Sequence, residues 1–325
     1  MKYGFNFLLL FSLTLLVSSC TEKSSVTGPS NSDSWTEING LPSFENIVQD
    51  VTGLYSSGSG IFHSTDGGET WIPLDTTLEH GNGAIAVIDG AVYSGDASYS
   101  RGIFLSTDHG SSWTAVDSGL GGQVGNYPAV SCLLTYGANV FAGTYHKGVF
   151  RTLGNPQWTA VNTGLYTGAW INCFAVSGYH IFAGTQFGVY LSIDDGSSWT
   201  LADSGFITNI YNPSRAPFIV SFATEGSNVF AGTFDGKVFV STNYGTSWAN
   251  VTDTLPTYGE FNVWLAATDS SVFVGCDGGM FASTNNGSSW TNITGNLPSG
   301  GVGCIAVVGK YLLVNAGNGV WRRKL

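Results

Sequence analysis

The chain has 325 residues, of which 45 are glycine and 14% are aromatic, while only 10% are charged. This composition suits many short strands joined by tight turns and disfavours a helix-rich fold. With 11 basic against 22 acidic residues the formal net charge is −11. Such a chain repels a phosphate backbone, so nucleic acid is not an expected partner.

The first residues carry an export pattern. Lys2 precedes an apolar run from Phe5 to Val17, which two serines and Cys20 follow. The run is shorter than the ~20 apolar residues of a spanning helix, so it predicts a signal peptide over residues 1–19. The segment Val17-Ser18-Ser19-Cys20 resembles the lipobox of bacterial lipoproteins, which implies lipidation of Cys20. The alternative is an ordinary secretory signal in which the cysteine is incidental.

Residues 20–33 separate this signal from the rest of the chain. They are rich in Ser, Thr, Gly and Pro, which predicts a flexible tether. The lipoprotein resemblance, with Thr21 rather than Asp after the cysteine, implies an outer-membrane lipoprotein that faces the periplasm or the cell surface. We expect a monomer that contacts the membrane only through its lipid.

From residue 34 to residue 325 one pattern recurs. It consists of an apolar strand, a strand such as Val-Phe-Ala-Gly-Thr, a strand such as Gly-Val-Phe-x-Ser, and a strand that begins Ser-Trp-Thr. In chain order the second strand lies at Leu54–Ser56, Val92–Gly95, Val140–Thr144, Ile181–Thr185, Val229–Thr233, Val272–Cys276 and Tyr311–Val314. Four short strands in a period of about 42 residues are typical of a propeller blade.

The two ends of this region complement each other. It opens with a lone tryptophan strand, Trp35–Ile38, and its last repeat lacks a fourth strand. We therefore predict an all-β, seven-bladed β-propeller of four-stranded antiparallel blades, in which the N-terminal strand completes the last blade. Closure of this kind removes an exposed sheet edge.

The loops between third and fourth strands share a motif. The pattern S-x-D-x-G-x-[ST]-W occurs in Ser64–Trp71, Ser106–Trp113 and Ser192–Trp199. Two later loops carry asparagine in place of the aspartate. The motif resembles the Asp-box, or bacterial neuraminidase repeat, of a β-propeller family. Short even blades of this kind are most similar to photosystem II assembly factor-like and exported repeat propellers, although a shared fold does not transmit function.

The chemistry of this motif is typical of a structural element. A short Asp or Asn side chain can accept backbone N–H bonds, and the tryptophan can fill the groove beside the next sheet. The residues with this predicted role are Asp66, Asp108, Asp194, Asn243, Asn285, Trp71, Trp113, Trp199, Trp248 and Trp290. Calcium is the alternative, but one carboxylate per loop suits poorly an ion that takes 6–8 oxygens. No metal or cofactor is expected.

One face of the predicted ring collects aromatic side chains. In propellers, the turns from second to third strand and the loops from one blade to the next share a face, which usually binds the ligand. Candidate ligand-binding residues there are Trp170, Tyr211, Arg215, Tyr166, Tyr127, Tyr145, His146, Tyr258 and Arg101. Exposed rings stack on sugars or on peptide side chains. We predict a non-catalytic binding or scaffold module for a glycan or an envelope protein, unless several of these side chains only brace long loops.

The alternative function is a carbohydrate-active hydrolase. It needs two carboxyl groups roughly 5–9.5 Å apart. Weak candidates by loop position are Glu260, Asp235, Asp277 and Asp96, and no sequence feature pairs them. Ser214–Pro217 fits the loose x-R-x-P pattern of sialidases, but it follows the first Asp-box instead of preceding it, which disfavours a sialidase. The chain shows no nucleophile elbow, phosphate loop or metal-binding His pattern, which favours binding over catalysis.

Four cysteines remain after Cys20. An even number in an exported protein favours disulfides. However, Cys132, Cys173 and Cys304 occupy the same place in three different repeats. We therefore favour free buried thiols for these three and for Cys276, with disulfides as the alternative.

Overall fold

The computed structural model describes residues 34–75, 83–97, 101–122, 127–153, 155–206, 217–252, 255 and 263–325. The predicted signal peptide, Cys20 and the tether lie outside the described residues. The described residues belong to one compact unit, and their regular secondary structure consists of β-strands. Within them, no helix has the length and hydropathy that crossing a bilayer requires.

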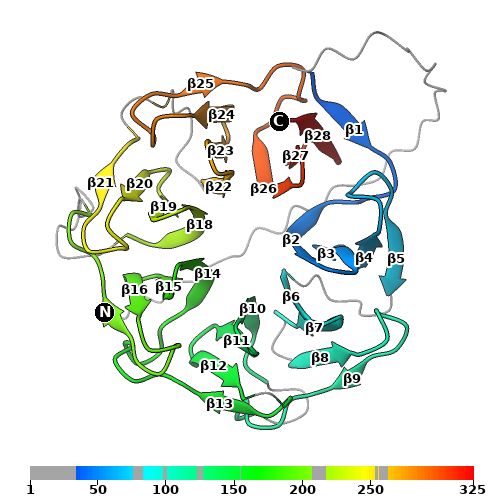
Figure 1. Ribbon diagram of the computed structural model, residues 1–325, viewed down its shortest axis with the longest axis vertical. Helices are drawn as coiled ribbons and strands as arrows, with labels where there is room; N and C mark the ends of the chain where they lie inside the picture. Colours follow the sequence, from blue (N-terminus) through cyan, green and yellow to red (C-terminus); the bar gives the residue numbers. More distant parts are fainter. Residues whose placement is uncertain are drawn as a thin grey trace, which may run out of the picture. The chain divides into compact units, whose positions relative to one another are not determined.

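Seven four-stranded antiparallel sheets form a ring of blades (Figure 1), which confirms the predicted fold. Blade 1 comprises β2 (Phe44–Asp50), β3 (Gly53–Gly58), β4 (Ile61–Ser64) and β5 (Ile72–Asp75). Blade 2 comprises β6 (Ala84–Ile88), β7 (Ala91–Gly95), β8 (Ile103–Ser106) and β9 (Thr114–Ala115). Blade 3 comprises β10 (Val130–Tyr136), β11 (Asn139–Thr144), β12 (Gly148–Thr152) and β13 (Trp158–Ala160). Blade 4 comprises β14 (Ile171–Ser177), β15 (His180–Thr185), β16 (Gly188–Ser192) and β17 (Thr200–Leu201). Blade 5 comprises β18 (Ile219–Glu225), β19 (Asn228–Thr233), β20 (Val238–Ser241) and β21 (Ala249–Asn250). Blade 6 comprises β22 (Trp264–Ala267), β23 (Val272–Cys276), β24 (Gly279–Ser283) and β25 (Thr291–Asn292).

Blade 7 is built from both ends of the described chain. It comprises β26 (Val302–Val308), β27 (Tyr311–Ala316), β28 (Gly319–Lys324) and the first strand, β1 (Thr36–Ile38). The register pairs Thr36 with Arg322 and Ile38 with Val320, and Figure 1 shows β1 beside β28. The predicted closure of the ring by the N-terminal strand is therefore confirmed.

The small residues of the second strands let neighbouring blades approach. In β11, a Cβ atom at Gly143 would lie 2.5 Å from Cys132 Sγ and 2.7 Å from Ile171 of blade 4. Such distances are far below van der Waals contact, so only glycine fits there. The following residue, Thr144, donates from Oγ1 to the Gly148 carbonyl at 2.7 Å and closes the turn to the third strand. The Phe-Ala-Gly-Thr pattern thus sets both the spacing of the blades and the geometry of the turn.

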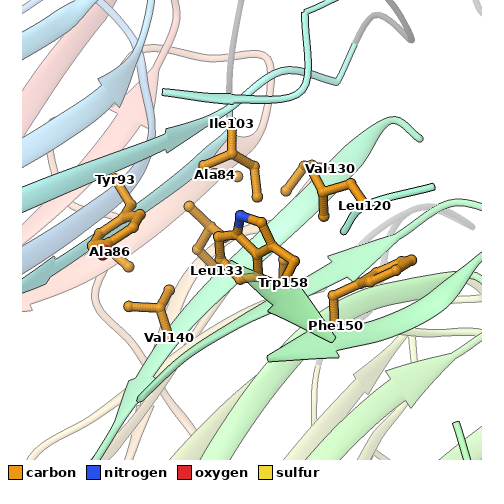
Figure 2. Close-up of a cluster of buried hydrophobic side chains, with 11 residues drawn as sticks. Ala84, Ala86, Tyr93, Ile103, Leu120, Val130, Leu133, Val140, Phe150 and Trp158 are labelled. Atoms are coloured by element: carbon orange, nitrogen blue, oxygen red, sulfur yellow. The ribbon is translucent and has the colours of Figure 1, made fainter. Parts of the chain in front are cut away.

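The hydrophobic core lies between blades, and Figure 2 shows the cluster between blades 2 and 3. Trp158 occupies its centre with 2% of its surface exposed. The Tyr93 ring meets it edge-on at 6.3 Å, and Trp158 Nε1 donates to the Val116 carbonyl of blade 2 at 2.7 Å. Burying an indole of 150–250 Å² contributes about 4–6 kcal/mol as an upper estimate. Each such tryptophan therefore joins two blades both by packing and by a hydrogen bond.

This indole hydrogen bond recurs around most of the ring. In five of the seven blades the tryptophan before the fourth strand donates to a carbonyl of the preceding blade at 2.7–3.0 Å, with the pairs Trp158–Val116, Trp199–Val161, Trp248–Ala202, Trp290–Val251 and Trp35–Ile293. In the other two blades, Trp71 Nε1 and Trp113 Nε1 are buried without a hydrogen-bond partner among the described residues. Both exceptions border blade 1.

Five loops between third and fourth strands share one hydrogen-bond pattern. In the first, Asp66 accepts bonds from the backbone N–H groups of Glu69 and Thr70 and from the Thr70 hydroxyl at 2.6 Å. Ser64 donates to Asp66 at 2.8 Å and accepts the Gly68 N–H at 2.9 Å. Asp108, Asp194, Asn243 and Asn285 accept equivalent bonds in their own loops. The acceptor oxygens are thus occupied by groups of the loop itself, which fits a structural role.

These bonds also act on the acidity of the loop carboxyls. Hydrogen bonds from Thr70 hold the pKa of Asp66 far below its usual range, and those from Ser112 lower the pKa of Asp108 to about 2. In the asparagine loops, Asn243 Nδ2 instead donates to Ser247 Oγ at 2.9 Å. Either side chain therefore satisfies the same turn, since the serine hydroxyl can donate or accept.

The four described cysteines are free thiols. Cys132 and Cys304 are buried, and burial raises the pKa of each to about 12, while Cys173 and Cys276 are half-buried. Burial and the nearby Cys132 thiol also raise the pKa of Cys173. These thiols are poor nucleophiles at neutral pH, since the thiolate is the reactive form.

Candidate functional site

The two faces of the ring are distinguished by their loops. In an antiparallel blade, the turn between second and third strands lies at the same end as the loop that leads from the fourth strand to the next blade. We call this end the upper face. The lower face carries the turns between first and second strands and the loops between third and fourth strands.

Seven ring-bearing side chains gather on the upper face of blades 3 to 5, and we call this set the upper aromatic arc. They come from five loops and are Tyr145, His146, Tyr166, Trp170, Phe187, Phe218 and Phe234. Tyr166 is 61% exposed and Phe234 is 39% exposed, the largest exposed apolar side chains of this face within the described residues. The arc is the most extensive set of solvent-accessible rings on this face of the described chain.

Trp170 is the central member of the upper aromatic arc. Its ring meets Tyr145 at 5.8 Å, His146 at 4.8 Å and Phe218 at 6.4 Å, and all three pairs are edge-to-face. Two further pairs extend the arc on either side: Phe218 with Phe234 at 5.6 Å, and Tyr166 with Phe187 at 4.6 Å. Rings that meet edge-on do not form one flat platform.

A hydrogen bond fixes the orientation of the central indole. Trp170 Nε1 donates to His146 Nδ1 at 2.7 Å. An indole nitrogen can only donate, so His146 Nδ1 is an acceptor and the imidazole carries its hydrogen on Nε2. His146 itself sits at a φ of +68°, a conformation that few residues other than glycine adopt. The backbone of this turn and the bond from Trp170 together fix the position of the His146 ring.

Backbone contacts hold the loops of the arc in place. The backbone N–H of Trp170 donates to Gln186 Oε1 at 2.6 Å, which ties the loop before β14 to the turn after β15. The Phe234 N–H donates to the Phe218 carbonyl at 2.9 Å and joins two loops of blade 5 in the same way. Beside them, the Lys237 ammonium pairs with Asp235 at 2.9 Å. The loops of the arc are thus tied to one another by hydrogen bonds, and one ion pair lies beside them.

The structure brings together four of the nine predicted ligand-binding residues, namely Tyr145, His146, Tyr166 and Trp170. Two others lie at blade 2: the Arg101 N–H donates to Asp96, and Tyr127 lies against Gly102. The remaining three, Tyr211, Arg215 and Tyr258, lie outside the described residues.

The described candidate carboxyls belong to three different blades. Asp96 is buried and accepts bonds within its own turn in blade 2, and Asp235 is ion-paired in blade 5. Asp277 lies in blade 6 against Gly301, and Glu260 lies outside the described residues. Within the described residues, no group of three or more His, Cys, Asp or Glu side chains is placed to hold a metal ion.

Four residues of the site are absent from the predicted ligand-binding residues: Phe187, Phe218, Phe234 and Gln186. Phe218 immediately precedes the first strand of blade 5, at the place that Trp170 occupies in blade 4, so aligning the repeats by that strand would have found it. Gln186 has no such signal, because its contact with Trp170 depends on the path of the loop.

Comparisons with known proteins show the fold alone. No family model and no curated protein matches the chain. Among solved structures, YCF48 bound to D1 peptide is 15% identical, with a TM-score of 0.66 over 90% of this chain and 96% of that one. The GH74 enzyme of Niastella koreensis is 20% identical, with a TM-score of 0.63 over 88% of this chain and 52% of that one. The extracellular domain of a one-component system from B. thetaiotaomicron is 15% identical, with a TM-score of 0.68 over 91% and 40%.

Proposed function

We propose that the protein is a non-catalytic binding module whose upper aromatic arc docks a segment of a partner protein of the cell envelope. The observation that carries this proposal is the collection of seven rings from five loops on one face of blades 3 to 5. Aromatic side chains offer a large contact area at a small entropic cost. A surface that is largely formed before binding limits that cost further.

The geometry of the arc favours a peptide over a glycan. Sugar rings stack best on a flat exposed ring face, whereas the pairs around Trp170 are edge-to-face at 78–86°. Rings set perpendicular to one another suit the side chains of an extended peptide, as on the aromatic-lined surfaces that recognise proline-rich segments. The similarity to YCF48 bound to D1 peptide supports the same choice. A glycan is the alternative ligand and forms one arm of the test.

Two further parts of the proposal concern the family and the membrane. The shared hydrogen-bond pattern of the five loops supports assignment of the chain to the Asp-box propellers. The sequence before residue 34 supports export and lipidation at Cys20, as an outer-membrane lipoprotein. Metabolic labelling with a palmitate analogue tests the anchor, because a Cys20→Ser variant should lose the label.

A paired array experiment tests the ligand. The purified protein is applied to an array of random peptides and to a glycan array, next to Trp170→Ala and Phe234→Ala variants. We expect peptide binding that falls at least about tenfold in both variants, as for central interface residues. Phe234 is exposed, so its variant should keep the melting temperature of the parent and separate lost binding from lost folding.

The matched control is Leu153→Ala on the lower face, which is as exposed as Tyr166 and should bind peptides like the parent. Sugar binding that both upper-face variants abolish would replace the peptide with a glycan. Equal peptide binding by parent and upper-face variants would overturn the site.

A further inference from the structure

A second exposed set of rings lies on the lower face, between blades 4 and 5. Tyr179, His180 and Tyr244 form three nearly parallel layers, with centroid separations of 4.1 and 4.6 Å and interplanar angles of 28° and 16°. We call this set the lower stack. Tyr179 is 64% exposed and Tyr244 is 39% exposed, while His180 between them is buried. The two outer rings therefore remain accessible to solvent.

Blade 7 shows what occupies the equivalent place elsewhere in the ring. Register aligns Tyr311 of β27 with His180 of β15, because each is the first residue after the lower turn. The Tyr311 ring is covered by Lys310 Nζ at 5.2 Å and by the Arg322 guanidinium at 5.0 Å. A cation held over a ring in this way is stabilised by the electrons of the ring face.

At blade 4 the chain replaces both of these cations. Tyr179 stands at the position of Lys310, and Leu191 stands at that of Arg322. In the part of the chain that the structure describes, no Lys or Arg lies over a ring of the lower stack; the third such contact places Arg151 over Phe141 in blade 3. Blade 4 thus carries the exposed Tyr179 ring, stacked on His180, where blade 7 carries Lys310 over Tyr311.

One acidic residue, Glu225, lies close to the lower stack, because Ser177 Oγ, three residues before His180, donates to the adjacent Gly226 carbonyl at 2.7 Å. The acidic loop between β16 and β17 instead packs on blade 3, where Arg151 donates to the Asp195 carbonyl. Glu225 ends β18 at the lower face of blade 5. The chain as a whole carries −11. Complementary charge speeds association and selects among partners.

We propose that the lower stack is a docking site for a basic segment of a partner protein, in which Lys or Arg side chains of the partner cover the exposed tyrosine rings. Lys310 and Arg322 over the Tyr311 ring in blade 7 are this chain's own example of such a cation–ring contact. This surface lies on the opposite face from the upper aromatic arc, so a protein partner at each face can bind without overlap.

The test measures binding of an acetylated peptide amide of alternating arginine and glycine by isothermal titration calorimetry. A peptide in which glutamate replaces arginine serves as the charge control. We expect the arginine peptide to bind, with an affinity that falls as salt is raised, and the glutamate peptide not to bind. A Tyr179→Ala, Tyr244→Ala double variant should lose about fivefold to tenfold in affinity, the size expected for two partly exposed cation–ring contacts.

Two variants separate ring contact from general attraction to an acidic protein. The double variant keeps the charge of the parent, and Tyr179→Phe with Tyr244→Phe keeps the rings and should retain the affinity of the parent. Tyr166→Ala on the upper face should also bind as the parent does. Equal affinity of the parent and the double alanine variant, at unchanged melting temperature, would overturn the proposal.

Discussion

The interfaces around blade 1 differ from the other five interfaces of the ring. Elsewhere a buried indole donates to a carbonyl of the preceding blade, whereas Trp71 and Trp113 have no such partner among the described residues. At the interface of blades 7 and 1, Glu69 instead accepts a hydrogen bond from Tyr311 at 2.9 Å and pairs with Arg322 at 2.6 Å. At the interface of blades 1 and 2, Tyr55 and His109 are hydrogen-bonded at 3.3 Å.

Strand β5 offers a physical reason for part of this difference. In the regular interfaces the acceptor lies three residues after the tryptophan of the preceding blade, which would be Leu74 for Trp113. Pro73 cannot donate a backbone hydrogen bond, and the pairing of β4 with β5 shifts register between Ile61 and Phe62. The comparison teaches that a blade interface tolerates the loss of the indole bond when polar contacts at the lower face span the same gap.

A second difference lies on the innermost strands. In blades 3 and 4 the residue at the bulge of the first strand donates to a carbonyl of the next blade: Ser131 Oγ to Ile171 O, and Asn172 Nδ2 to Ile219 O at 2.8 Å. Blade 1 carries Glu45 at this position. An ionised carboxylate cannot donate, so blade 1 lacks at this position a contact that blades 3 and 4 possess.

Removing the closing strand should have the largest effect on these interfaces. Deleting residues 34–39 removes β1 and with it the burial of Trp35 and its bond to Ile293 at 2.9 Å. It also leaves the edge of β28 unpaired in a blade that borders an interface without the indole bond. We expect loss of cooperative unfolding and aggregation, measured by calorimetry and light scattering. A deletion that melts like the parent would show that the ring does not depend on closure.

Matched tryptophan substitutions should separate the two kinds of interface. Trp199→Phe removes a bond to the Val161 carbonyl at 2.9 Å, whereas Trp71→Phe removes an indole nitrogen that has no partner among the described residues. Both side chains are buried, so the loss of packing is similar. Leaving a buried carbonyl unsatisfied costs about 1–3 kcal/mol. Urea unfolding should therefore show Trp199→Phe to be the more destabilising by roughly that amount, and equal effects would contradict the distinction.

The repeats predicted the blades because each repeat carries its own strand pattern, turn residues and tryptophan. Closure of the ring was predictable because the first strand lacked partners in its own repeat and the last repeat lacked a fourth strand. The clustering of Tyr145, His146 and Trp170 on one face followed from loop order. The edge-to-face packing and the bond between His146 and Trp170 did not, since they depend on side-chain directions that spacing leaves open. The missing bonds of Trp71 and Trp113 were equally hidden, because their loops read like those of Trp199.

The smallest expected effect concerns the inner strand of blade 1. Glu45 keeps contact with solvent, yet the surrounding protein raises the pKa of its carboxyl above the ordinary value of 4.5. The folded state therefore binds more protons than the unfolded chain, and stability falls as pH rises from about 4.5 through the raised pKa. Glu45→Gln should remove this dependence and stabilise the protein at pH 7.5 by less than about 1 kcal/mol, because solvent screens an exposed group.

The reverse substitution in blade 4 provides the matched control for Glu45→Gln. Asn172→Asp should introduce the same pH dependence there, because it replaces the Nδ2 donor that bonds to the Ile219 carbonyl at 2.8 Å. Urea unfolding at pH 4.5 and pH 7.5 compares the two variants with the parent. A lower stability of Glu45→Gln at pH 7.5 would mean that the carboxylate makes a favourable contact, and blade 1 would then have its own inner bond instead of lacking one. The expected result is that, relative to the parent, the fall of stability with pH becomes shallower in Glu45→Gln and steeper in Asn172→Asp. That result would attribute the contrast between blades 1 and 4 to the side chain at this one position.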